Sequence, residues 1–314
     1  MEKPHVTPGS KENQEQYHWT FNGRVMVIDN GARFSSQETF STFMELNTFS
    51  VVSFDPLNKL ATIEDLDKTE ELQIVPNITL GNGQPVIRYD CLNESTSATL
   101  KPLDSTIANS KANNEKDAGP NSILLQHPIN SIALDSIDGL NRADWVLLDE
   151  LNDNLSIIQN SPTRLQQALL LDINVPFHFS HEGQADFPVL SYLLHDYGFR
   201  FFRFHETLSK TDLPIDIYLE KKQFSDTKLV QALFIPTDER LEAMEKNDLL
   251  KLGFLLHTVY KCKDTAYKML KYVDEDLARE YLIAEGFLWP VNDEETAFVL
   301  TESYSPDIWQ EALF

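Results

Sequence analysis

Cysteine and recognisable metal-binding patterns are scarce in this sequence of 314 residues. Cys91 and Cys262 are far apart, which fits a reducing compartment and offers no disulfide framework. No two histidines or cysteines have the spacing of a metal site. The nearest pair, His178 and His181, follows Pro176 in a loop-like stretch. We therefore expect no metal.

Basic residues and long apolar runs are also scarce. The chain has 26 Lys and Arg against 49 Asp and Glu, a formal net charge of −23. Such a chain repels nucleic acid and anionic membranes unless it carries a local basic patch, and none is visible. Apolar runs such as "ALLLDINVPF" are too short to span a membrane, and the polar N-terminus has no signal-peptide core. We expect a cytoplasmic protein.

Two catalytic signatures are missing. A dinucleotide-dependent oxidoreductase would show G-x-G-x-x-G after its first strand, where this chain has Gly31 alone. A hydrolase with a nucleophile elbow would show G-x-S-x-G, which is absent, and neither cysteine stands in a nucleophile context. Both classes are disfavoured.

What is present is an alternation of short apolar runs and helical spacing. The pattern predicts strands at 24–30, 49–56, 144–150, 169–177, 199–206 and 229–237, with helices at 35–46 and 186–198. The runs 71–80 and 85–92 flank "GNG", which is typical of a hairpin. Strands alternating with helices predict an α/β fold with a mostly parallel, doubly wound sheet.

The organisation predicted from this pattern has three parts. Residues 1–18 form a disordered tail, residues 19–237 form the α/β domain, and residues 238–314 form a C-terminal helical region. Asp264 and Asp274 are expected N-caps there, and Gly286 is expected just past a helix end. The stretch "LLKLGFLLHTVY" is too apolar to stand alone in water, so it packs on its own domain or on a partner, which includes an oligomer formed through these helices. The polar segment 101–121 is expected to be a mobile loop.

Three acids follow or end expected strands: Asp29, Asp55 and Asp149. Ligands of doubly wound sheets bind outside the carboxyl ends of the strands, and an acid after the second strand can accept both ribose hydroxyls of a nucleoside. Gly31 would let the backbone approach such a ligand. Each acid by itself is also the ordinary residue of a cap or turn.

The order of these pieces resembles the FkbM family of S-adenosylmethionine (SAM)-dependent methyltransferases over about residues 20–237. Its "D-x-G-A-N-x-G" and "F-E-P" correspond here to "DNGARFS" and "FDP", followed by "GNG", a serine pair and "LDS". The resemblance implies a Rossmann-like methyltransferase fold in which Asp29, Gly31 and Asp55 hold SAM, with Asp55 on the ribose. It further implies that Asp149 borders the substrate and orients or deprotonates a hydroxyl, and that Ser95 and Ser97 line the substrate cleft.

The departures from the family pattern leave the activity open. Its Asn and second Gly are Arg33 and Ser35, and four positions of "K-I-D-x-E-G-x-E" have changed, to Leu147, Leu151, Asn152 and Asn154. Two hypotheses follow. One is a SAM-dependent methyltransferase that O-methylates a sugar or another hydroxyl-bearing small molecule, which needs alignment more than acid–base help. The other is a non-catalytic relative, a scaffold or partner subunit that binds a protein and has lost SAM.

Overall fold

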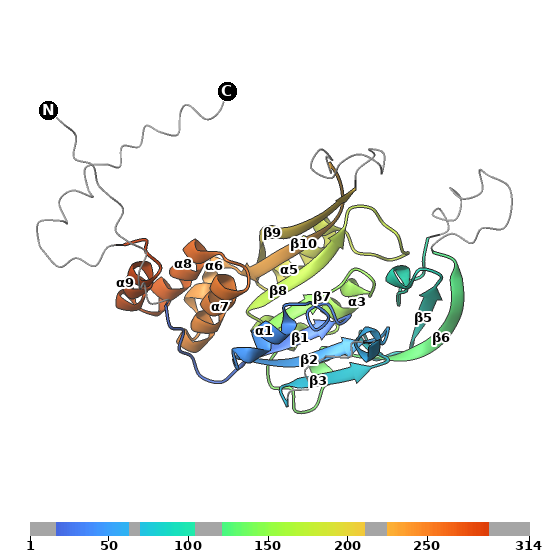
Figure 1. Ribbon diagram of the computed structural model, residues 1–314, viewed down its shortest axis with the longest axis horizontal. Helices are drawn as coiled ribbons and strands as arrows, with labels where there is room; N and C mark the ends of the chain where they lie inside the picture. Colours follow the sequence, from blue (N-terminus) through green and yellow to red (C-terminus); the bar gives the residue numbers. More distant parts are fainter. Residues whose placement is uncertain (1–16, 63–69, 104–120, 211–224, 289–314) are drawn as a thin grey trace, which may run out of the picture. The chain divides into compact units, whose positions relative to one another are not determined.

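The computed structural model describes residues 17–62, 70–103, 121–210 and 225–288 (Figure 1). They fall into two compact units, one of residues 22–252 and one of residues 17–21 with 253–288. Helix α7, Lys246–Thr258, contributes to both. Most of the expected tail and the last part of the expected helical region lie outside the described residues, as does most of the loop expected at 101–121.

The larger unit is built on a seven-stranded sheet. Its strands are β1 Val25–Asn30, β2 Phe49–Asp55, β3 Leu72–Pro76, β7 Trp145–Leu148, β8 Leu170–Pro176, β9 Phe199–Lys210 and β10 Asp226–Pro236. Their order is β3-β2-β1-β7-β8-β10-β9, and β10 alone runs against the others. This mostly parallel sheet, with helices and C-terminal helices following, confirms the predicted Rossmann-like methyltransferase fold.

A second, three-stranded sheet stands between β3 and β7 in the chain. It contains β4 Ile78–Leu80, β5 Val86–Cys91 and β6 Ile123–Ile132, with β6 in the middle. The predicted hairpin between 71–80 and 85–92 is therefore wrong, because β4 and β5 each pair with β6. Asn77, at φ +56°, turns the chain and splits the first run into β3, which pairs with β2, and β4, which pairs with β6. Asparagine accepts this left-handed conformation more readily than most residues.

Helices of the larger unit follow their local signals. They are α1 Phe40–Glu45, α3 Asn154–Gln159, α4 Pro162–Gln167, α5 Phe187–Asp196 and α6 Asp238–Glu242, with short 3₁₀ turns η1 Lys59–Thr62, η2 Glu94–Thr96 and η3 Leu134–Ser136. Asp186 caps α5 by accepting from Val189 N, and Gly198 follows the helix at φ +76°. The predicted helix at 186–198 is confirmed.

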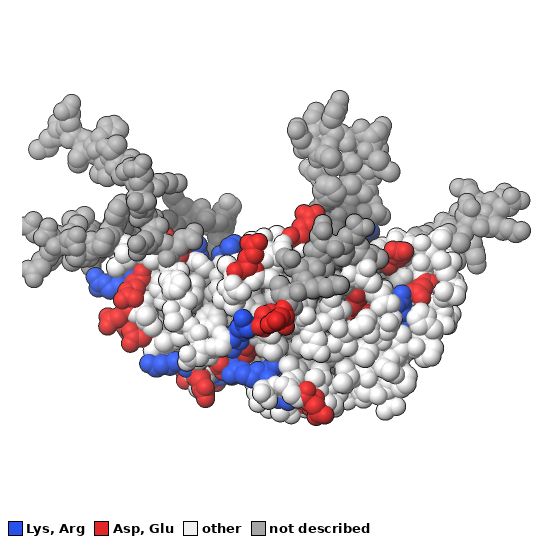
Figure 2. All heavy atoms as spheres, turned by 60° about the horizontal axis from the view of Figure 1, so that its bottom comes forward, with Lys and Arg blue, Asp and Glu red and all other residues white. Residues whose placement is uncertain are grey.

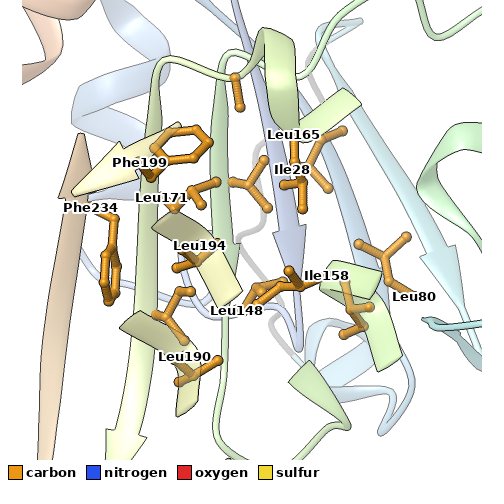
Figure 3. Close-up of a cluster of buried hydrophobic side chains, with 14 of the residues drawn as sticks. Ile28, Leu80, Leu148, Ile158, Leu165, Leu171, Leu190, Leu194, Phe199 and Phe234 are labelled. Carbon is orange, nitrogen blue, oxygen red and sulfur yellow. The ribbon is translucent and has the colours of Figure 1, made fainter. Parts of the chain in front are cut away.

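The hydrophobic core lies between the sheet and α3, α4 and α5 (Figure 3). Leu148 of β7 and Leu171 of β8 face Leu190 and Leu194 of α5 in this cluster, and all four are buried. Every residue of β8 is buried, as expected for an interior strand of a sheet covered on both faces. A charged residue within β8 therefore requires a specific partner.

The smaller unit has its own aromatic core, with helices α8 Lys263–Val273 and α9 Glu275–Ala284. Trp19 packs edge-on against Phe254 and Tyr281, and Tyr281 Oη is 2.8 Å from His257 Nδ1. Burial lowers the pKa of His257. Asp274 caps α9, as predicted.

Two further properties concern the described residues as a whole. Within the described ranges, no helix has both the length and the apolar character needed to cross a membrane. Lys and Arg side chains are scattered among Asp and Glu on the face drawn in Figure 2.

Candidate functional site

The predicted acids meet at one edge of the large sheet. Asp29 lies in β1, Asp55 ends β2, and Asp149 follows β7, so the parallel strands bring all three to their carboxyl ends. β1 and β7 are neighbours although two strands of the sheet come between them in the chain, and such a reversal of strand order is where ligands of open α/β sheets bind. We call this edge the strand-end site, comprising Asp29, Gly31, Arg33, Asp55, Lys59, Asp149 and Asp172.

Asp29 holds the loop that follows β1. Its Oδ1 accepts from the backbone N–H groups of Arg33 at 2.8 Å and Phe34 at 3.1 Å. Its Oδ2 accepts from the N–H and hydroxyl of Ser35, at 2.8 and 2.7 Å, and from the Ser53 hydroxyl at 3.2 Å. The carboxylate is fully buried, so these internal donors replace solvent and fix the loop.

Asp55 forms a turn with η1. Its two oxygens accept from the backbone N–H groups of Lys59, at 2.9 Å, and Leu60, at 2.8 Å. The residue is 1% exposed. An acid able to bind ribose hydroxyls thus lies at the end of the second strand, but both of its oxygens already accept hydrogen bonds from the protein's own backbone.

Gly31 and Asp149 depend on each other sterically. Gly31 has φ +92°, and a Cβ on it would lie 2.0 Å from Asp149 Oδ2. The close backbone approach that this glycine allows is therefore to the protein's own carboxylate. Lys59 Nζ donates to the Gly31 carbonyl at 3.0 Å and lies 3.9 Å from Asp149 Oδ2.

Asp149 is a carboxylate with one satisfied and one unsatisfied oxygen. Oδ1 accepts from Leu151 N at 3.2 Å and from Asn152 Nδ2 at 2.6 Å, whereas Oδ2 is buried without a hydrogen-bond partner among the described residues. Desolvation raises the pKa of Asp149 to about 6, and the Lys59 charge opposes this shift. A carboxyl with such a pKa can exchange a proton near neutral pH.

Polar side chains from separate segments support Asp149. Asn152 Oδ1 accepts from the hydroxyls of Thr79 at 3.0 Å and Thr99 at 2.8 Å, and Thr79 also reaches Asn30 Oδ1 at 3.3 Å. This network links β1, the strand β4 and the turn after β7. Asn152, a departure from the family pattern, is therefore an integral part of the site.

Arg33 reaches from the loop after β1, past the end of β7, to Asp172 inside β8. Its guanidinium donates to the carbonyl of Asp172 at 3.0 Å and, more weakly, to that of Leu148 at 3.4 Å, and it pairs with Asp172 Oδ1 at 2.6 Å. The side chains are only 9% and 4% exposed, so this is a buried ion pair. It occupies the sheet edge beside the point where the strand order reverses.

The serine pair lies in the turn after β5. Ser95 is exposed and bonds Asn93 Oδ1 through its N–H and hydroxyl, while the buried Ser97 hydroxyl accepts from Cys91 N at 3.0 Å. From this segment it is Thr99 that joins the Asp149 network. The substrate role of Ser95 and Ser97 stays a prediction.

Sequence reasoning identified the acids but missed Lys59, Asp172 and the role of Arg33. Asp172 carried a usable signal, because a charge inside the apolar run "LLLDINV" cannot be buried without a partner. Lys59 carried none, since its reach to Gly31 depends on the turn at Asp55.

The arrangement does not fit SAM in the way that the family resemblance implies. Ribose binding needs an accessible Asp55, which is 1% exposed and bonded to backbone N–H groups. Close passage of a ligand along the β1 loop needs small residues, yet Arg33 fills the strand ends and the Ser35 hydroxyl is turned inward to Asp29.

Comparisons with known proteins return only distant structural matches. No family model matches the chain, and no curated protein matches it. Similar solved structures include precorrin-6y C5,15-methyltransferase from Geobacter metallireducens (13% identity, TM-score 0.32, covering 68% of this chain and 82% of that one). Another is magnesium protoporphyrin IX methyltransferase from Synechocystis with bound SAM (11% identity, TM-score 0.32, covering 67% and 70%). At such identities and TM-scores, function has to be argued from the chain's own residues.

Proposed function

We propose that this protein is a non-catalytic member of the methyltransferase fold class that acts by binding a protein partner. The observation that carries the proposal is the buried pair between Arg33, in the loop after β1, and Asp172, inside β8 beside the end of β7. A residue that would be a small polar neighbour of the cofactor in the FkbM pattern is here a cation paired within the protein. The cytoplasm is the expected setting, and the C-terminal helices are the expected place for a partner or a second copy to bind.

The energy of this pair explains why SAM would bind poorly. A ligand entering beside β1 and β7 must displace the guanidinium and leave Asp172 as a buried, unpaired charge. Breaking a buried pair in this way costs about 3–5 kcal/mol. Since about 1.4 kcal/mol is a factor of ten, a site that would otherwise bind SAM with micromolar affinity becomes about 10²–10³-fold weaker or more.

The second candidate is an FkbM-type, SAM-dependent methyltransferase acting on the hydroxyl of a sugar or other small molecule. The observation that favours it is Asp149 Oδ2, a buried oxygen without a hydrogen-bond partner among the described residues, on a carboxyl whose pKa is raised to about 6. Such a carboxylate could orient a substrate hydroxyl or accept its proton.

Calorimetric titration with SAM and S-adenosylhomocysteine tests both candidates. We expect the wild-type protein to bind either ligand with a Kd of about 0.1 mM or weaker, since a micromolar affinity is reduced at least about 10²-fold. A variant carrying Arg33→Asn and Asp172→Asn removes the pair without leaving a lone charge, so it reports whether the pair alone excludes the ligand. Lys101→Met is the matched control for loss of a cation at an exposed pair.

Micromolar binding by the wild-type protein that is lost in Asp55→Ala would contradict the non-catalytic proposal and favour the methyltransferase. Binding that persists in Asp55→Ala would instead remove Asp55 from the ribose site.

A further inference from the structure

A small cavity of about 170 Å³ opens where β8, β9 and β10 lie side by side. It is separate from the residues of the strand-end site. The residues that line it are Asn174, Glu206, Thr207, Leu208, Leu229, Val230 and Gln231. Pockets that take drug-sized ligands are roughly 300–1,000 Å³. This cavity suits a single extended side chain or a small amine.

A β-bulge builds the polar end of the cavity. Phe204 pairs with Ala232 and Thr207 pairs with Val230, so two residues of β9 stand opposite Gln231 alone. A bulge of this kind redirects side chains locally. Gln231 Nε2 donates to Glu206 Oε2 at 3.1 Å, and Gln231 is the register partner of Asn174 across the β8–β10 pair.

Asn174 contributes an oxygen that still needs a donor. It is 9% exposed, its Nδ2 donates to Glu150 Oε2 at 2.7 Å, and its buried Oδ1 has no hydrogen-bond partner among the described residues. A buried carbonyl oxygen left without a donor is costly, so its presence at a cavity points to a ligand that supplies one.

The cavity therefore offers acceptors to a ligand that carries hydrogen-bond donors and positive charge. One amide N–H of Asn174 donates to Glu150 and one of Gln231 donates to Glu206, and Asn174 Oδ1 and the Glu206 carboxylate remain as acceptors. None of the described residues that line the cavity is Lys or Arg, and the chain as a whole carries −23. Anionic ligands are disfavoured by this field.

The other part of the lining is aliphatic. Leu208 and Leu229 lie beside the polar group, whereas the Val230 side chain packs in the hydrophobic core, and Leu208 is 61% exposed. Apolar surface next to clustered acceptors matches an alkyl chain that ends in an ammonium, which has three donors and no acceptor.

We propose that this cavity binds a primary ammonium on an alkyl chain, with the ammonium at Asn174 Oδ1 and Glu206 and the chain against Leu208 and Leu229. The chemistry is shared by a free alkylamine and by a lysine side chain of a partner protein. The site does not depend on the function proposed above, because none of its lining residues belongs to the strand-end site.

The test is a titration of the deuterated, ¹⁵N-labelled full chain, followed by amide chemical shifts. The probes are n-butylammonium and Nα-acetyl-lysine methylamide, with Nα-acetyl-norleucine methylamide as the probe that keeps the alkyl chain and lacks the ammonium. We expect saturable shifts at the amides of residues 206–208 and 229–231 with both amines and none with the norleucine probe. Glu206→Gln, an isosteric change at an exposed residue, should weaken binding about tenfold or more, the range for a hydrogen bond to a charged group. Glu182→Gln, at another exposed acid, should leave it unchanged.

Equal affinity for the two amines supports a small-molecule ligand, and tighter binding of the lysine probe supports a lysine of a partner. Absence of saturable shifts at these amides, an equal response to the norleucine probe, or an unchanged affinity in Glu206→Gln would each overturn the proposal. SAM titrations of the strand-end site leave this result untouched, so the two proposals fail independently.

Discussion

Breaking the Arg33–Asp172 pair is the perturbation whose size follows most directly from the structure. The Arg33 guanidinium makes a 2.6 Å ion pair with Asp172 Oδ1 and a 3.0 Å bond to its carbonyl, and the two side chains are 9% and 4% exposed. Arg33→Met keeps much of the aliphatic stem and removes the charge. We expect a loss of about 3–5 kcal/mol in the free energy of unfolding, because Asp172 is left buried without its counter-charge.

The double variant separates the effect of removing a charge from the effect of losing packing. Asp172→Leu should also be destabilising, since it leaves the guanidinium without its carboxylate. The double variant Arg33→Met with Asp172→Leu buries no charge, and replacement of a buried pair by apolar residues is often neutral. We expect the double variant to recover most of the stability lost by either single variant.

Urea denaturation of the four proteins gives the coupling energy as a double-mutant cycle. Lys101→Met at the Lys101–Glu182 pair, whose side chains are 45% and 53% exposed, is the control and should cost less than about 1 kcal/mol. If Arg33→Met cost no more than this control, or if the two changes at Arg33 and Asp172 were simply additive, the pair would not hold the strand ends and the reasoning would be refuted.

Three other perturbations test the same site. Asp29→Asn places an amide against N–H and hydroxyl donors, so it should lose about 2–4 kcal/mol of stability, given about 1.5–3 kcal/mol for each bond to a charged group and partial rearrangement. Thermal unfolding measures it, and an unchanged midpoint would contradict the anchoring role. Gly31→Ala should lose more stability than Gly23→Ala, because both positions have positive φ but only at Gly31 would the new Cβ meet Asp149 Oδ2, at 2.0 Å. Equal losses in urea would show that strain in φ, and not the contact, sets the cost. Asp149 has a folded-state pKa raised to about 6, so it binds a proton more tightly folded than unfolded and its contribution to stability is lost as pH rises from about 4 through about 6. Between pH 4 and pH 7 the wild type should therefore lose about 2 kcal/mol relative to Asp149→Asn, on the basis of about 1.4 kcal/mol per pKa unit. A constant difference between the two proteins across this range would mean that the carboxyl titrates normally.

The strands of the fold were predictable from sequence because buried parallel strands appear as short apolar runs. "VMVID", "FSVVSF" and "LLLDINV" become β1, β2 and β8 near the expected bounds. The pairing of strands was less predictable, since it depends on distant partners. β6 contains Pro128 and many polar residues, and it pairs with both β4 and β5, which the "GNG" turn had suggested would pair with each other.

For the site, too, the positions of residues could be predicted from the local sequence, whereas their hydrogen-bond partners could not. An acid at the end of a parallel strand must lie at the carboxyl edge of the sheet, so Asp55 and Asp149 could be placed from sequence. What bonds their oxygens could not be, because the donors come from loop conformations: the turn into η1 for Asp55, and the Asn152 side chain for Asp149.

The role of Arg33 could not be predicted from its position in the sequence alone, because it depends on a distant partner. In the sequence it stands where the FkbM pattern has asparagine, and Asp172, 139 positions away, is an isolated acid in an apolar run. The structure joins them into one feature, because neither charge is tolerable in this burial without the other. Arg33→Asn by itself would therefore leave Asp172 uncompensated inside a buried strand. Removing the pair without leaving a buried lone charge requires both positions to change, and this dependence supports the proposal that the strand-end site serves internal support.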